Sequence, residues 1–156
     1  MMITLILPYP ISANRYWAHR IVRPKGGKPM ALTYITPEAK SYKQQVAWHC
    51  KAAGILEPIA GRVHIDIKLY PKRPLDWAKR AAKNPEGWDD DVMCLDLDNV
   101  NKVLLDSLKD VAIQDDKWVR KITAERMEPD GEARLVVTIR QLKLPAAQNQ
   151  LFEEVA

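Results

Sequence analysis

Apolar and polar residues follow two rhythms along the chain, and these rhythms predict the main elements. Residues 3–7 form a short apolar run that two prolines stop, and residues 62–70 alternate apolar with polar side chains, so both are predicted strands. Residues 118–127 and 133–141 also read as strands. Because they flank a Pro-Asp-Gly turn, they predict a hairpin.

Two segments have the spacing of helices. Thr36, followed by Pro37 and Glu38, is a helix start, and Gly54 ends a helix predicted to run to about residue 53. Residues 97–111 carry apolar side chains at three- and four-residue steps, which predicts a helix with one apolar stripe. The stripe consists of Leu97, Val100, Leu104, Leu108 and Val111, whereas Asp98, Lys102 and Asp106 share a different, polar face.

The remaining segments predict connections. Residues 12–20 are expected to form a loop, and residues 23–29 a flexible basic turn around two glycines. Residues 71–93 are a long connection with a helical turn near 76–83, and long connections are usually functional or disordered. The length of 156 residues predicts one domain, 1–144, followed by a polar C-terminal tail, 145–156.

Composition and charge narrow the classes of function. The opening residues lack the basic leader of a signal peptide, and no run approaches the roughly 20 apolar residues of a membrane span, so a cytoplasmic protein with no membrane partner is expected. Cys50 and Cys94 predict idle thiols rather than a disulfide framework. Residues 1–62 carry nine Lys and Arg against two Glu, which suits a polyanion partner; a solvated basic surface is the alternative.

Carboxylates gather at both ends of the second predicted helix. Asp96 and Asp98 stand at its start, and Asp115 and Asp116 follow its end. A hard cation such as Mg²⁺ takes oxygen ligands from two or three carboxylates, completed by phosphate oxygens and water, so the set predicts a metal site. The alternative is ordinary capping of helix starts, with Asp98 and Lys102 as an i,i+4 surface ion pair. His19, His49 and His64 lack metal-ligand spacing, and structural or phosphate-facing roles are expected for them.

Three blocks of sequence resemble the RusA family of Holliday junction resolvases, small endodeoxyribonucleases common in prophages. The blocks are "ITLILPYPISANRYWAHR", "TPEAKSYKQQV" and "DLDNVNKVLLDSL" with the later "QDDKWV", in the family's order. The resemblance implies an α/β (α+β) single domain in which a small mixed β-sheet packs against two main helices. It also implies a bacterial or phage-encoded homodimer that needs Mg²⁺, for which Mn²⁺ can substitute, and that cuts four-way junction DNA symmetrically.

Carried over by residue, the resemblance assigns roles to the carboxylate region. The metal-binding aspartates fall on Asp96, Asp98 and Asp116, and the catalytic lysine falls on Lys102, so these four form the expected catalytic set. Asn99, Asp106 and Asp115 take supporting roles. The expected DNA contacts, chosen for charge and hydrogen-bonding capacity, are Asn14, Arg15, Tyr16, Lys72, Arg73, Lys117, Arg120 and Lys121.

The chain departs from the family pattern at residues 71–93. Family members enter the Asp-Leu-Asp block through a short arginine-rich loop, whereas this chain has the long connection followed by Cys94 and Leu95. Two other functions therefore stay open: a junction-binding or branched-DNA-binding protein without cleavage, and a nuclease selective for other branched DNA. Three carboxylates beside a bound polyanion argue against pure binding.

Overall fold

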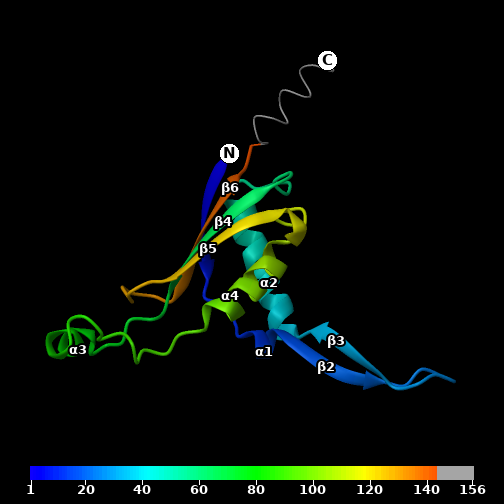
Figure 1. Cartoon of the computed structure of the whole chain (residues 1–156), viewed down its shortest axis with the longest axis horizontal. Coiled ribbons are helices and arrows are strands. Elements are labelled where there is room, and N and C mark those ends of the chain that lie inside the picture. Colours follow the sequence, from blue (N-terminus) through cyan, green and yellow to red (C-terminus); the bar gives the residue numbers. More distant parts are fainter. Residues whose placement is uncertain (144–156) are drawn as a thin grey trace, which may run out of the picture.

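Four strands form one mixed sheet in the order β1-β6-β4-β5. The strands are β1 (Met2–Pro8), β4 (Val63–Tyr70), β5 (Val119–Arg126) and β6 (Arg134–Gln141) in a computed structural model that describes residues 1–143. β6 is antiparallel to β1 and β4, and β5 is parallel to β4. The sheet packs on the two main helices (Figure 1). The predicted fold class is therefore confirmed.

The strands predicted at 118–127 and 133–141 are present as β5 and β6, but they do not pair with each other. β6 lies between β1 and β4, so the predicted hairpin is wrong. The reason lies in burial: every second side chain of β6 is fully buried, which suits a central strand, whereas β5 is mostly exposed and suits an edge. The parallel β4–β5 pair needs a long crossover, which residues 71–118 supply.

The two main helices are α2 (Pro37–Ala52) and α4 (Leu97–Leu108). The Thr36 hydroxyl accepts a hydrogen bond from the Ala39 amide at 3.2 Å, and Gly54 adopts a φ of 92°, so the predicted start and stop of α2 are confirmed. α4 ends three residues before its predicted limit. Lys109 leaves helical geometry with a ψ of 136°, and Asp110 follows with a φ of 63°.

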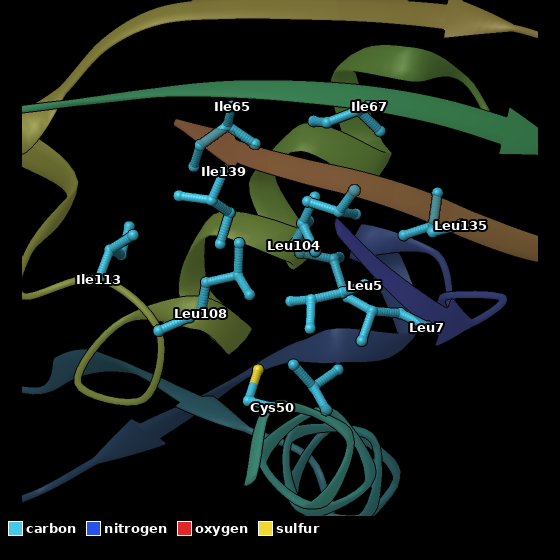
Figure 2. Close-up of a cluster of buried hydrophobic side chains, with 14 of the residues drawn as sticks. Leu5, Leu7, Cys50, Ile65, Ile67, Leu104, Leu108, Ile113, Leu135 and Ile139 are labelled. Atoms are coloured by element: carbon cyan, nitrogen blue, oxygen red, sulfur yellow. The ribbon is translucent and has the colours of Figure 1, made fainter. Parts of the chain in front are cut away.

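One apolar core joins the sheet to both helices. Figure 2 shows side chains of α2, α4 and three strands pointing toward one another, and all of those it labels are buried. Burial raises the pKa of the Cys50 thiol to about 11, so this thiol stays protonated at neutral pH. Both cysteines are free, as expected. The labelled core residues are Leu5, Leu7, Cys50, Ile65, Ile67, Leu104, Leu108, Ile113, Leu135 and Ile139.

The N-terminal region is more ordered than the sequence predicts. Residues expected to form a loop instead make the short helix α1 (Ala13–Tyr16) and strand β2 (Trp17–Val22). β2 pairs with β3 (Met30–Ile35) in an antiparallel hairpin, with Gly26 at a φ of 76° in its turn. The expectation of a loop over residues 12–20 is therefore wrong. The hairpin projects from the body of the molecule (Figure 1).

The long connection after β4 contains the helical turn that the sequence predicts. It is α3 (Trp77–Lys83), and a 3₁₀ helix, η1 (Asp116–Trp118), precedes β5. Figure 1 shows α3 and the β2–β3 hairpin extending to opposite sides of the molecule, with α4 and α1 between them. The predicted tail, 145–156, lies outside the described residues. Across residues 1–143, no helix combines the length and apolar character needed to cross a membrane.

Removing a core side chain of α4 tests this packing. Leu104→Ala is expected to lower the free energy of unfolding by about 2–5 kcal/mol, because Leu104 is fully buried and the lost side chain leaves a cavity. Leu56→Ala is the matched control: Leu56 is 84% exposed, and its loss is expected to change stability by under about 0.5 kcal/mol. Urea denaturation measures both. Equal effects would contradict the core position of α4.

Candidate active site

A cleft of about 710 Å³ follows the polar face of α4. The helix contributes Asn99, Lys102 and Asp106 to the cleft wall, which are spaced by three and four residues and therefore share one face. Lys102 is exposed, and no ion pair to it is found within residues 1–143. The i,i+4 ion pair between Asp98 and Lys102, which belonged to the alternative interpretation, is therefore absent from the described residues, and the Lys102 ammonium is available to an anion.

The opposite wall comes from α1 and the β2–β3 hairpin. It includes Asn14, Trp17, His19 and Thr33, and the His19 Nδ1 lies 2.9 Å from the Thr33 hydroxyl across the two strands. Sequence reasoning assigned Asn14 to DNA contact and gave His19 a structural or phosphate-facing role. It did not single out Trp17 or Thr33. Both strands are mostly exposed and neither alternates strictly between apolar and polar residues, so the sequence gives only a weak signal for a hairpin around the glycine turn.

Asp106 is held in place by two partners from other elements. The Tyr16 hydroxyl donates a hydrogen bond to Asp106 Oδ2, and the Lys43 ammonium lies 3.6 Å from the same oxygen. Burial, followed by the hydrogen bond to Asp106, raises the pKa of Tyr16 well above its usual range. Tyr16 is 0% exposed, so the expectation that it contacts DNA is corrected: it positions Asp106 beside Lys102.

The two late aspartates have different surroundings. The Asp115 carboxylate accepts a hydrogen bond from the Lys117 amide at 3.1 Å and lies 3.5 Å from the Lys109 ammonium. These contacts, the amide first, lower the pKa of Asp115. Asp115 therefore caps η1, whereas Asp116 is exposed and lines the cleft.

Asp96 and Asp98 lie at the start of α4, beside the cleft. Asp96 is the N-cap residue and its side chain makes no capping hydrogen bond, and Asp98 is in the first turn. Both are exposed, and neither lines the cleft, although Asn99, the neighbour of Asp98, does. The capping alternative therefore does not account for the Asp96 side chain.

The predicted metal ligands do not form a closed cage in the single chain. Within residues 1–143, no three His, Cys, Asp or Glu side chains are arranged to hold a metal ion. Mg²⁺ is commonly held by one or two carboxylates with substrate phosphates and water, rather than by a cage built only of protein. The exposed oxygens of Asp96, Asp98 and Asp116 match that chemistry, while the ligand set itself stays a prediction.

Most of the predicted DNA contacts are exposed cations. Arg15 is exposed and its guanidinium lies 2.7 Å from a Glu38 oxygen, so an incoming phosphate would compete with that carboxylate. The Lys117 ammonium lies 5.4 Å from the centre of the neighbouring Trp118 ring. Arg120 and Lys121 are exposed on β5, the edge strand. Their role in DNA binding stays a prediction.

Lys72 and Arg73 lie apart from the α4 cleft. They follow β4 and line a second cleft beside α3, and the Arg73 guanidinium lies 4.6 Å from the centre of the Trp77 ring. They are therefore not neighbours of Lys102 in the α4 cleft, and any contact they make with DNA is to a different part of it.

Comparison with known proteins finds one family over most of the chain. The family model described as endodeoxyribonuclease RusA matches residues 8–140. The match covers α1, α4, η1 and both walls of the α4 cleft. No curated protein matches the chain.

Tyr16→Phe tests the contact that positions Asp106. At pH 7 the free energy of unfolding is expected to fall by about 1–2 kcal/mol, because a hydrogen bond to a part-buried carboxylate is lost. The raised pKa of Tyr16 means that its contribution is present below about pH 10, the unfolded pKa, and is lost as pH rises above it.

The variant should accordingly lose less stability than wild type between pH 9 and pH 11, as measured by urea denaturation at each pH. Tyr34→Phe is the control, since Tyr34 is 42% exposed on β3. A variant whose stability falls with alkaline pH as steeply as that of wild type would show that the pKa of Tyr16 is not raised in the folded chain.

Proposed function

The chain belongs to the RusA family of endodeoxyribonucleases, and from that membership we propose that it resolves Holliday junctions by paired, symmetric hydrolysis of phosphodiester bonds. The family supports junction-resolving endonuclease activity in general. The part played by single residues and by a metal ion in this chain is our proposal. The observation that supports it best is one cleft shared by Lys102, Asp106 and Asp116.

Lys102 is proposed to hold the scissile phosphate. Its ammonium is exposed on the cleft wall between Asn99 and Asp106. Hydrolysis of a phosphodiester adds negative charge to the phosphorus oxygens in the transition state, and a fixed cation stabilises that charge more than it stabilises the substrate. Asp106, held by Tyr16 and Lys43, places a carboxylate one turn from Lys102 on the same cleft wall.

Asp96, Asp98 and Asp116 are proposed to hold Mg²⁺, with Mn²⁺ as a substitute. When bound there, the ion would activate a water molecule and neutralise charge on the phosphate. The proposal is supported by the exposure of all three carboxylates and by the absence of a capping bond at Asp96. Phosphate oxygens of the DNA would complete the ligand set.

Asn14 and Asn99 are proposed to orient the DNA backbone in the cleft. They lie on opposite walls, one on α1 and one on α4, and amide groups donate hydrogen bonds to phosphate oxygens without adding charge. Backbone contacts of this kind fix the register of the nucleic acid and leave the chemistry to the charged groups.

Symmetric cutting is proposed to require a homodimer. A four-way junction presents two equivalent strands related by a two-fold axis, and each chain has one α4 cleft. Two copies related by a two-fold axis would place one cleft on each strand. The same symmetry explains why paired cuts leave two duplexes, each with one nick.

A cleavage assay on a synthetic four-way junction tests the proposed function. Wild type with Mg²⁺ is expected to cut the junction and to leave a linear duplex of equal length intact, whereas removal of Mg²⁺ should stop cutting. Asp98→Asn should slow cutting about 100-fold or more. It should bind the junction at least as tightly, because it removes a negative charge near the phosphates.

Asp110→Asn is the matched control, since Asp110 is also exposed but follows the C-terminal end of α4, and asparagine tolerates its positive φ. It should cut at the wild-type rate. If wild type and Asp98→Asn both bind the junction and neither cuts it, the protein is a binding module. Equal cutting of duplex and junction would support a general nuclease.

A further inference from the structure

A second cleft, of about 590 Å³, lies beside α3. We call it the α3 cleft; it is lined by Tyr9, residues 72–75, Arg80, residues 91–95 and Ala133. None of these residues lines the α4 cleft. Most of the residues that line the α3 cleft belong to the long connection between β4 and α4.

The α3 cleft has fixed walls. The Arg126 guanidinium donates hydrogen bonds to the carbonyl oxygens of Asp89 and Val92, at 2.9 and 3.1 Å. The indole N–H of Trp88 donates to a Glu128 carboxylate oxygen at 2.6 Å. These contacts tie residues 88–92 to the end of β5. The α3 segment is therefore anchored to the sheet at one side of the cleft.

The opposite side of the connection is anchored as well. The backbone N–H of Arg73 donates to the Gly131 carbonyl at 2.9 Å, and the Leu95 amide donates to the Tyr9 hydroxyl at 2.8 Å. A segment held at both ends keeps its backbone in a defined arrangement. A binding site needs such a rigid scaffold, whereas a transient surface contact does not.

Two large apolar side chains at the α3 cleft face water. Leu75 is 102% exposed and Met93 is 93% exposed, although both line the cleft. Covering apolar surface is favourable, so an anchored segment that holds two such side chains open provides a surface for a flat apolar group. Partly buried Val92 and Leu95 extend the same apolar surface inward.

Cations lie beside this apolar surface. Lys72, Arg73 and Arg80 line the α3 cleft with a single carboxylate, Asp91. Arg80 is already paired with Asp76 at 2.9 Å, which leaves Lys72 and Arg73 for an anion. The cleft therefore combines a place for a flat apolar group with a place for a phosphate.

The α3 cleft also lies close to the proposed metal ligands along the chain. Met93 precedes Asp96 by three residues, and an extended chain spans at most about 11 Å over that length. Leu95, in the cleft wall, is the direct neighbour of Asp96. A DNA strand that follows this path would pass from one cleft to the carboxylates within one or two nucleotides.

We infer that the α3 cleft binds one unstacked nucleotide of DNA, with the base on Leu75 and Met93 and the phosphate on Lys72 and Arg73. The inference rests on the proposed function, because it names the form of DNA that the site accepts beside the carboxylates. A base in continuous duplex is covered by its stacked neighbours and cannot reach the two apolar side chains, whereas an opened or single-stranded nucleotide can.

The affinity of the protein for a fluorescent oligothymidine of ten nucleotides tests the inference. The measurement is made in EDTA so that no cutting occurs. Leu75→Ser with Met93→Ser, and separately Lys72→Ala with Arg73→Ala, should each weaken binding about ten-fold. Only the second pair should reduce the salt dependence, by about 0.7 in the slope of log K against log salt, because one phosphate contact is lost. These side chains lie on the surface, so the variants keep the core intact.

The controls are Lys79→Ala with Lys83→Ala, which removes two cations of α3 outside the cleft, and Leu56→Ser, which removes an exposed leucine elsewhere. Both should bind the oligonucleotide within about two-fold of wild type. Equal weakening by the Lys72, Arg73 pair and the Lys79, Lys83 pair would overturn the inference, since it would show a general charge effect. The inference would also be overturned if the Leu75→Ser, Met93→Ser variant bound the oligonucleotide as tightly as wild type does.

The same experiment separates this inference from the proposed function. Oligonucleotide binding that depends on the α3 cleft, in a protein that does not cut junctions, would refute the nuclease proposal and leave the nucleotide site standing. Conversely, junction cutting that is unaffected by all four cleft substitutions, together with unchanged oligonucleotide binding, would refute the nucleotide site alone.

Discussion

The packing of α4 against the sheet is the contact on which the rest of the structure depends. Val100, Leu104 and Leu108 are fully buried against strands that come from both ends of the chain. Once this stripe is buried, helical geometry turns Lys102 and Asp106 outward on another face. The core thus fixes the direction of the side chains that line the cleft, and the apolar stripe and the candidate site are two consequences of one helix orientation.

Sequence patterns predict this fold as far as local interactions decide it. The cap at Thr36, the stop at Gly54 and the strand at Val63–Tyr70 all follow from neighbours in the sequence, and all are present. The pairing of β5 and β6 does not follow, because alternation identifies a strand and says nothing about its partner. The β2–β3 hairpin escaped prediction because its strands are exposed and short, with weak periodicity.

The two walls of the candidate site differ in the same way in how far the sequence predicts them. The α4 wall could be predicted, since Lys102 and Asp106 lie one turn apart on a single helix. The other wall could not, because His19 and Thr33 meet the helix only through the tertiary fold. Tertiary contacts also separate residues that look alike in sequence: the Asp115 side chain caps η1, whereas the Asp116 side chain does not. The buried Tyr16 hydroxyl donates a hydrogen bond to Asp106. The family resemblance selected the second aspartate of the pair, which the spacing alone leaves open.

We propose that Lys102 and carboxylates from both ends of α4 act together, and that these carboxylates hold a metal ion when DNA supplies the remaining ligands. Anomalous diffraction from crystals of the protein with Mn²⁺ and an uncleavable four-way junction tests that proposed arrangement most directly. The account predicts a Mn²⁺ peak bonded to an oxygen of Asp96 or Asp98 and to one of Asp116, with the Lys102 ammonium on the same phosphate. A peak remote from α4, or Asp116 turned away from the other two in the DNA complex, would contradict it.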